Sequence, residues 1–186
     1  LDKKDKDILF ELSLDARKPV SEIAKKVRLS KQVVSYRIKK LEEMNVIEGY
    51  YAILNNFKLG MLRCRLDMKY SGMAKEKEEE ILHFIKNHPK VGWIAQLDGD
   101  MDLALTLYVK DLLEFEEAYS EIVDKYDSYF SKTFITYVTR IYHFKYKFLK
   151  EEKSEDEIIL EGNVENLNLD KTDYSILKIL SKNARA

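Results

Sequence analysis

A block of basic side chains between Arg17 and Lys40 is the strongest chemical signal in the sequence. It holds nine Lys and Arg residues and a single acid, Glu22, although the whole chain of 186 residues has a net charge of −1. Cations at this density suit a polyanion, because they neutralise phosphate charges. Charge runs also occur on helix faces that are merely solvated. The surrounding pattern must therefore decide between a nucleic-acid partner and an ordinary surface.

Three short helices are predicted around this block, and together they describe a helix-turn-helix unit. The first covers about residues 3–14, the second follows the N-cap candidate Ser21, and the third follows Ser30. In the third helix Val34, Ile38 and Leu41 recur at helical spacing and form one buried stripe. The opposite face then points outward, where its side chains can meet DNA.

The candidate DNA contacts divide into base-reading and phosphate-binding side chains. The amide of Gln32 suits adenine, and the hydroxyl of Ser35 suits either donors or acceptors. Cations beside them suit phosphates, which fix the register of the helix without reading sequence. An N-cap role alone would also account for Ser30. The full predicted set is Ser30, Lys31, Gln32, Ser35, Tyr36, Arg37, Lys39, Lys40, Lys25 and Arg28, with Lys25, Arg28, Arg37 and Lys40 assigned to phosphates.

Patterns that follow the basic block predict a wing and a second domain. An apolar hairpin over 46–53 is expected as the wing. Alternating strands are expected over 62–70, 91–97, 103–109 and 134–148, with helices over 75–87 and from Asp111. This order predicts an α+β chain, in which an N-terminal winged helix-turn-helix is followed by a ferredoxin-like βαββαβ effector and oligomerisation domain. A dimer partner should cover the bare sheet face, where we expect Tyr137, Tyr142, Phe144, Tyr146 and Phe148.

The last part of the chain is predicted to be an acidic linker followed by a repeat. Residues 151–168 hold seven acids and one Lys. From Leu169 the sequence returns to its own beginning, with ten identities at a constant offset of 168 positions. We therefore expect the first helix of a second helix-turn-helix copy, which breaks off at Ala186. The predicted domains are 1–57, 58–150, 151–168 (the linker) and 169–186 (the truncated repeat).

These motifs resemble the Lrp/AsnC regulators, also called feast/famine regulatory proteins, over roughly residues 1–149. The resemblance implies a sequence-specific DNA-binding transcriptional regulator that binds double-stranded promoter DNA, forms homodimers or higher homo-oligomers, and responds to an amino acid or a related small molecule. One departure is Met101, which stands where the family usually has an aromatic residue before its signature Asp. The matching residues are Leu1-Asp2, Asp5, Ile8-Leu9, Asp15-Ala16-Arg17, Glu22-Ile23-Ala24, Leu29-Ser30, Val34, Arg37 to Glu42, Val46-Ile47, Gly49-Tyr50, Gly99 and Asp102.

The acidic segment 98–102 is open to two interpretations, a plain hairpin turn and an effector loop. Backbone amides at Gly99 suit a carboxylate, and Asp98 or Asp100 suits an ammonium group. A calcium loop is excluded, because Leu103 and Val109 stand where an EF-hand needs Gly and Glu. The ligand interpretation is taken mainly from the family, and its candidate residues are Gln96, Asp98, Gly99, Asp100, Asp102, Thr136 and Thr139.

Other chemistry finds little support in the sequence. No catalytic set or Gly-rich phosphate loop stands out, and His83, His88, His143 and Cys64 lack metal-ligand spacing, so we predict no enzyme activity, cofactor or metal. The single Cys and the lack of a signal peptide or membrane-length apolar run predict a cytoplasmic protein without membrane contact. Two alternatives stay open: a subunit similar to the Lrp-like tetrapyrrole decarboxylases, and an oligomeric scaffold that binds no DNA.

Overall fold

A computed structural model of the chain describes residues 1–144, 146–149, 157–162 and 167–185. The chain divides into two compact units, close to the expected boundary after residue 57. The helical unit consists of Leu1–Leu54, Tyr142–Ile159 and Asn168–Ala186, and the sheet unit consists of Asn55–Ile141 and Leu160–Leu167. No helix among the described residues is long and apolar enough to cross a membrane.

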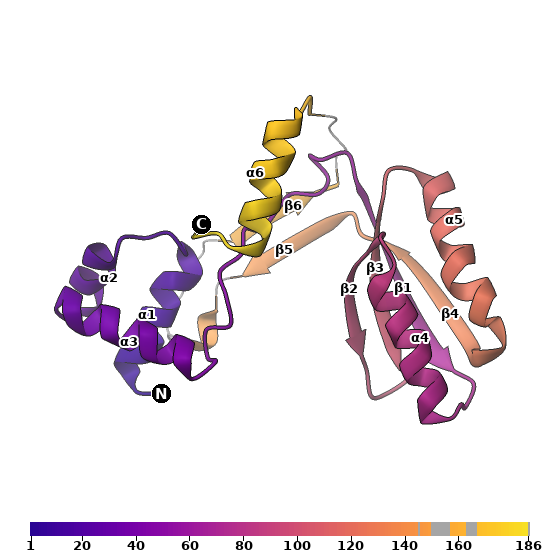
Figure 1. Cartoon of the computed structure of the whole chain (residues 1–186), viewed down its shortest axis with the longest axis horizontal. Helices are drawn as coiled ribbons and strands as arrows, with labels where there is room; N and C mark the ends of the chain where they lie inside the picture. The colour runs from indigo at the N-terminus through magenta and orange to yellow at the C-terminus, as the bar shows by residue number, and fades with distance from the viewer. Residues whose placement is uncertain (145, 150–156, 163–166, 186) are drawn as a thin grey trace. The chain divides into compact units, whose positions relative to one another are not determined.

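Three helices open the helical unit and confirm the predicted helix-turn-helix (Figure 1). They are α1 (Lys3–Leu14), α2 (Val20–Val27) and α3 (Lys31–Glu43). Asp2 and Asp5 form a capping box that satisfies the free N–H groups at the start of α1. Ser30 caps α3, because its hydroxyl oxygen accepts a hydrogen bond from the Val33 N–H at 3.3 Å.

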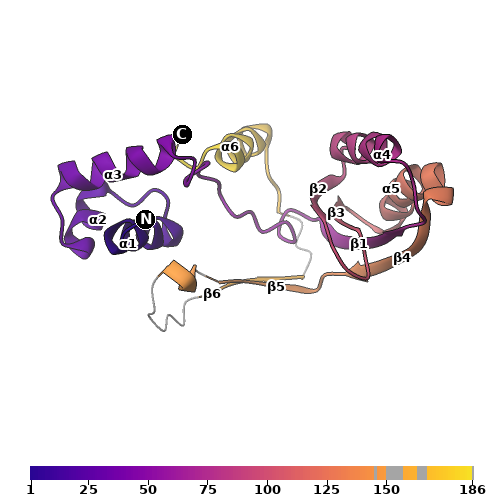
Figure 2. The ribbon, with the colours of Figure 1, turned by 90° about the horizontal axis from the view of Figure 1, so that it is seen from below.

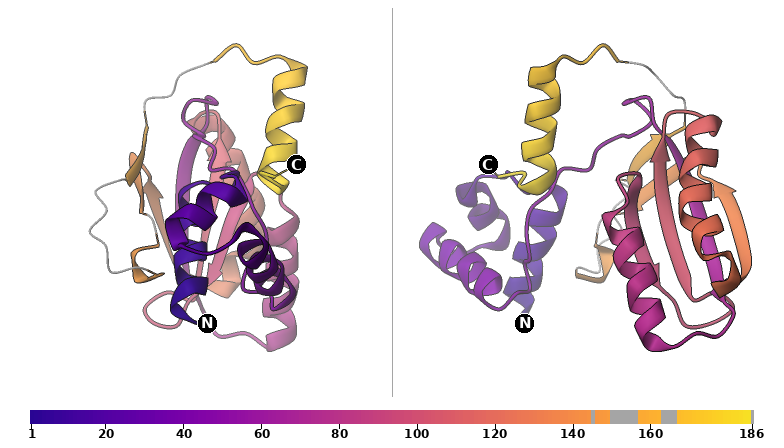
Figure 3. Two further views of the ribbon diagram at one scale, coloured as in Figure 1. Left: turned by 90° about the vertical axis from the view of Figure 1, so that its left-hand side faces the viewer. Right: turned by 45° about the vertical axis from the view of Figure 1, so that its right-hand side comes forward.

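One apolar core joins the three helices, which Figure 3 shows gathered into one bundle. The predicted stripe of Val34, Ile38 and Leu41 is buried, which confirms the orientation expected for α3. Arg28 ends α2 in the left-handed conformation, at a φ of +56°, so the chain can reverse before α3 begins. The clustered core side chains are Ile8, Leu12, Ile23, Ala24, Val27, Val34 and Ile38.

A four-stranded antiparallel sheet with two helices forms the body of the sheet unit. Its elements in chain order are β1 (Leu62–Tyr70), α4 (Lys75–Asn87), β2 (Val91–Gln96), β3 (Leu103–Val109), α5 (Leu112–Val123), the 3₁₀ turn η1 (Asp124–Tyr129) and β4 (Phe130–Tyr137). The strand order β2-β3-β1-β4 is that of a ferredoxin-like sheet. Both helices lie on one face of the sheet (Figure 2).

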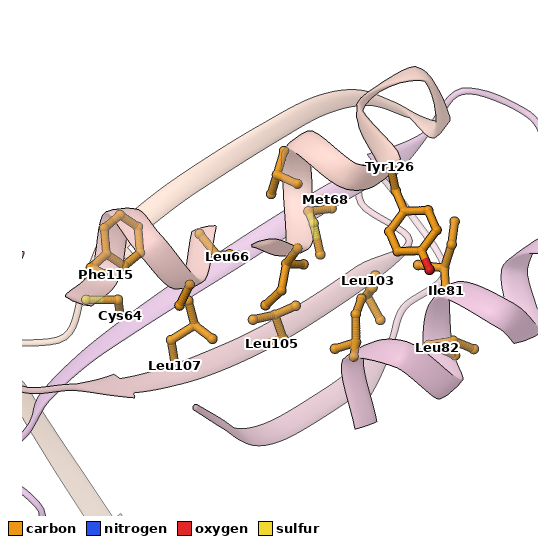
Figure 4. Close-up of a cluster of buried hydrophobic side chains, with 14 of the residues drawn as sticks. Cys64, Leu66, Met68, Ile81, Leu82, Leu103, Leu105, Leu107, Phe115 and Tyr126 are labelled. Carbon is orange, nitrogen blue, oxygen red and sulfur yellow. The ribbon is translucent and has the colours of Figure 1, made fainter. Parts of the chain in front are cut away.

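The core of the sheet unit lies between that face and the two helices. Alternate residues of β1 point into it, namely Cys64, Leu66 and Met68, as the period-2 pattern predicts. Figure 4 shows them on the same side of the sheet as Leu105 and Leu107 of the neighbouring strand β3. Ile81 and Leu82 of α4 and Phe115 of α5 close the core from the helix side.

The long strand expected over 134–148 was wrong, because the chain leaves the sheet after Tyr137. There the Val138 N–H still donates to the Arg63 carbonyl at 2.9 Å, but the next strand, β5 (Arg140–Phe144), pairs with β6 (Glu157–Glu161) in a separate two-stranded sheet. A short turn, η2 (Lys147–Leu149), follows β5. Tyr137 is opposite Cys64 in the register, so it lies on the helix face and not on the bare face.

The wing hairpin expected over 46–53 is not formed, and residues 46–53 contain no strand. Their main chain instead bonds to the repeat. The Ala52 N–H donates to the Leu180 carbonyl at 3.1 Å, and the Ala184 N–H donates to the Tyr50 carbonyl at 2.7 Å. These partners come from α6 (Lys171–Lys182) and the residues after it. Of the predicted acidic linker, 151–156 and 163–166 lie outside the described residues.

Candidate nucleic-acid interface

The outward face of α3 gathers most of the predicted DNA contacts. Lys31, Gln32, Ser35 and Lys39 are exposed on it. Tyr36 is the most prominent apolar side chain there, with 67% of its surface exposed. Because the opposite stripe of α3 is buried, packing fixes which side chains point to solvent. Ser30 is exposed at the start of the same helix, where its hydroxyl already serves as the cap.

Basic side chains border this face on both helices. Lys25 of α2, Arg28 of the turn and Lys40 of α3 are all exposed. Lys39 approaches Glu43 at 3.8 Å, but both side chains are largely solvated, so the pair is weak. The first turn of α3 carries no acid. The start of the helix therefore combines cations with the positive end of the helix dipole, which favours an anionic partner.

Arg37 has partners inside the protein, which the sequence did not indicate. Its guanidinium group lies 2.8 Å from an Asp2 carboxylate oxygen and 2.6 Å from one of Asp5. The pKa of Asp2 lies below its usual range, first because the Asp5 N–H donates to its carboxylate and then because Arg37 binds it. The pKa of Arg37 is raised by the same two carboxylates. Arg37 thus ties α3 to the start of α1.

The predicted effector residues do not form one site. Asp102 holds the turn of residues 97–102 against β1, since its carboxylate accepts hydrogen bonds from Lys69 Nζ and the Tyr70 N–H, both at 2.8 Å. The hydrogen bond from Lys69 is the main reason that the pKa of Asp102 is lowered. Asp98 and Asp100 are exposed in the same turn. Gly99 between them has a φ of +152°, which favours glycine.

The other effector candidates have surroundings of their own, although Gln96 directly precedes that turn. Gln96 donates to Glu78 of α4 at 3.0 Å. Thr136 is opposite Arg65, near the middle of β1. Thr139 lines a cavity of about 430 Å³, whose other walls the sequence did not predict. Those walls are Phe57, Leu62, Arg63, Tyr137, Val138, Arg140, Glu161 and Gly162.

The charged side chains that line this cavity are two arginines and one glutamate. Arg140 pairs with Glu161 at 3.1 Å. Arg63 lies with its guanidinium carbon 5.7 Å from the centre of the Tyr108 ring, and its buried Nε has no hydrogen-bond partner among the described residues. The alternation in β1 predicted an outward Arg63. It could not predict that residues 137–140 and 161–162 would surround it, because those contacts are distant in sequence.

A three-helix unit with an exposed basic helix, followed by a sheet of ferredoxin-like order, defines a class of DNA-binding regulator with a second α+β domain. The helix-turn-helix part matches the family model described as "Winged helix-turn-helix DNA-binding", over residues 1–48. The proline dehydrogenase transcriptional activator of Rhodobacter capsulatus is 32% identical over 122 residues, which are 65% of this chain and 79% of that protein. The transcriptional regulator LrpA of Pyrococcus horikoshii is 33% identical over 127 residues, which are 68% of this chain and 89% of that protein.

Solved structures support the same fold over both units. An AsnC family transcriptional regulator from Agrobacterium tumefaciens superposes with a TM-score of 0.67 at 24% identity, covering 74% of this chain and 90% of that one. A regulator from Neisseria meningitidis, solved in complex with L-Met, gives a TM-score of 0.64 at 24% identity, with 74% and 89% covered. The chain belongs to the Lrp/AsnC family of transcriptional regulators. The relatives named above are regulators, so the comparisons do not favour the enzyme alternative.

Proposed function

We propose that this regulator reads promoter DNA by placing the first two turns of α3 in the major groove. The exposed face of α3, fixed by its buried stripe, carries the proposal. Gln32 and Ser35 meet base edges, with Lys31, Tyr36 and Lys39 beside them. Because promoter DNA is the target, we infer a cytoplasmic site of action and no catalytic role.

Phosphate contacts come from the cations at the border of the interface. Lys25, Arg28 and Lys40 are exposed there, and we assign them to the DNA backbone. Arg37 was predicted to join them. We now assign it a positioning role, because its ion pairs with Asp2 and Asp5 orient α3 on α1.

Fluorescence anisotropy with duplex DNA at several salt concentrations tests both assignments. Gln32→Ala should weaken binding to the preferred sequence by about 5–150-fold, corresponding to about 1–3 kcal/mol, and should reduce the preference over random DNA. Lys40→Ala should weaken binding to the preferred sequence and to random DNA equally, and it should lower the salt dependence of binding by about one unit of slope. Lys75→Ala, on an exposed position of α4, is the matched control. If Gln32→Ala leaves the sequence preference intact, α3 does not read the bases.

We further propose a homodimer formed through the bare face of the sheet. Trp93 and Phe134 stand on that face, 44% and 48% exposed, at positions opposite Thr106 and Asp67 in the register. Large exposed aromatic side chains on a sheet commonly mark an interface. Trp93→Glu with Phe134→Glu should reduce the mass measured by light scattering from dimer to monomer. Leu113→Glu, at an exposed apolar position of α5, should leave it unchanged; equal masses for all variants would contradict the proposal.

We propose an amino acid as the effector, held at the turn of residues 98–100. Asp98 and Asp100 supply exposed carboxylates for an ammonium group, and the Gly99 amide suits the ligand carboxylate. The L-Met complex of the Neisseria relative supports an amino acid as the ligand class. Calorimetric titration with L-methionine and L-leucine should detect binding that Asp98→Asn with Asp100→Asn weakens by about tenfold or more. Glu116→Gln on α5 is the control, and unchanged binding in the double variant would remove this turn as the site.

A further inference from the structure

The helix α6 repeats α1 in local structure as well as in sequence. At the start of α1 the Asp5 N–H donates to Asp2 at 2.8 Å, and the Asp2 N–H donates back to Asp5 at 3.1 Å. At the start of α6 the Asp173 N–H donates to Asp170 at 2.9 Å, and the return bond is 3.0 Å. Both helices therefore begin with the same capping box.

The two helices also end alike. The C-cap residues Asp15 and Asn183 have φ and ψ angles of −153° and 106°, and of −149° and 102°. Each C-cap side chain accepts a hydrogen bond from the N–H two residues later, Arg17 at 2.8 Å and Arg185 at 2.9 Å. The helices α1 and α6 thus share the same backbone geometry at both ends.

The end of α6 is docked on the extended segment Tyr50–Ala52 (Figure 1). The two main-chain hydrogen bonds described above, Ala52 to Leu180 and Ala184 to Tyr50, join them. Ala184 is buried, with 7% of its surface exposed. The guanidinium carbon of Arg185 lies 4.0 Å from the centre of the Tyr50 ring, which is a cation–π contact.

The hydroxyl of Tyr50 donates to Glu42 of α3 at 2.8 Å, which fixes the ring that Arg185 covers. Burial is the main reason that the pKa of Tyr50 is raised to about 12. The Tyr50 side chain is therefore uncharged at neutral pH, and its hydrogen bond to α3 holds the ring in the place where Arg185 contacts it.

One contact joins a segment to its own repeat. Arg185 Nε donates to the Ala16 carbonyl at 2.6 Å, and Arg185 and Ala184 are the repeat counterparts of Arg17 and Ala16. A surface that meets its own copy is what a two-fold axis between identical units produces. The end of α6 thus lies against the end of α1, of which it is the sequence repeat.

The end of α1 has the matching groups unused. The counterparts of the Leu180 carbonyl and the Ala184 N–H are the Leu12 carbonyl and the Ala16 N–H. Neither takes part in a backbone hydrogen bond among the described residues. Free carbonyls at a helix end need a partner or water. The end of α1 thus carries an acceptor and a donor without backbone partners at the positions that α6 uses to bind Tyr50–Ala52.

We propose that Tyr50–Ala52 is an interaction edge for the end of α1 from a second copy of this chain, and that α6 occupies the edge in competition with it. The docked α6 keeps the helix-turn-helix units of two chains from pairing at this edge. Its release opens the edge for a reciprocal contact, in which Arg17 of each copy covers Tyr50 of the other. This pairing is independent of the sheet dimer proposed above.

Cross-linking between two differently tagged chains tests the competition. One chain carries Ala16→Cys and the other Tyr51→Cys, and both are produced together and treated with a short bis-maleimide. The native Cys64 is buried, and burial raises its pKa to about 11, so it contributes no reactive thiol. A product that contains both tags reports only contacts between chains.

The measurement compares this product in two backgrounds. Ala184→Arg with Arg185→Glu removes α6 from the edge, and Lys178→Glu, on an exposed position of α6, is the matched control. A tethered segment has an effective concentration of roughly millimolar, far above micromolar chains, so release should raise the mixed product by about tenfold or more. Circular dichroism of the released variant checks that its helices persist. A mixed product that does not rise, with helices intact, overturns the proposal.

Discussion

Glu11 offers the sharpest test of how the helical unit is held together. Its side chain is 7% exposed on α1, yet it is a carboxylate. Lys18 Nζ lies 2.6 Å from Glu11 Oε2, and Lys26 Nζ lies 3.2 Å from the same oxygen. Burial alone would raise the pKa of Glu11, but the two lysines outweigh it and the pKa is lowered. The change to test is Glu11→Gln, which keeps the shape and removes the charge.

The size of the effect follows from what the substitution leaves behind. The Lys18 side chain is only 12% exposed, so it would keep a nearly buried ammonium without a counter-charge. Lys26 is 56% exposed and can turn to water, so it adds little. A hydrogen bond to a charged group contributes about 1.5–3 kcal/mol, and loss of one buried partner costs more. We expect Glu11→Gln to lower the free energy of unfolding by about 2 kcal/mol, which lowers the Tm of a chain of 186 residues by about 4–8 °C.

Thermal unfolding followed by circular dichroism measures the loss. Glu43→Gln is the matched control, because its partner Lys39 is exposed and the expected loss is about 0.3–0.5 kcal/mol. The effect of Glu11 should also depend on pH. A lowered folded-state pKa stabilises the protein at neutral pH, and this stabilisation is lost as the pH falls through that pKa. Equal stability of the two variants at neutral pH would show that Lys18 escapes to solvent, and it would refute the argument.

Three further substitutions test other contacts. A methyl group at Gly92 would lie 2.0 Å from a Tyr108 ring carbon, so Gly92→Ala should cost about 1–3 kcal/mol in urea unfolding; no loss would mean that the ring moves freely. Arg37→Ala should weaken duplex binding in anisotropy titrations without changing its salt slope, because Arg37 pairs with Asp2 and Asp5; a slope lowered by about 1 would indicate a phosphate contact and contradict the positioning role. Lys69 lowers the pKa of Asp102, so Asp102→Asn should destabilise the sheet unit at neutral pH and progressively less toward acid, and equal losses at all pH values would contradict this.

Local patterns in the sequence predicted the elements and their buried faces well. The spacing of Val34, Ile38 and Leu41 fixed the buried side of α3, and alternation fixed that of β1. Both depend on periodicities that hold within one element. The cap at Ser30 was predicted for the same reason, since a cap involves only neighbours within one turn. The cap expected at Ser21 was wrong, because α2 begins at Val20 with Pro19 in the N-cap position.

Contacts between residues that are far apart in the sequence were not predicted. Alternating aromatic residues continue past Tyr137, so nothing local marked the point where β4 ends and β5 takes another partner. The basic character of Arg37 predicted a phosphate contact, but Asp2 and Asp5 reach it from another helix. The cavity beside Arg63 was not predicted either, because segments that are far apart in the sequence form its walls.

The repeated segment separates what a sequence encodes locally from what its surroundings decide. Ile8 of α1 is completely buried, whereas its counterpart Ile176 in α6 is 50% exposed. Both helices form all the same, because their caps are made of identical or similar residues at matching positions. Burial depends instead on α2 and α3, which cover α1. The main-chain groups at the end of α6 form hydrogen bonds with Tyr50–Ala52, whereas the matching groups at the end of α1 form no backbone hydrogen bond among the described residues. The same seventeen-residue motif is therefore a core helix at one place in the chain and an interaction element at the other.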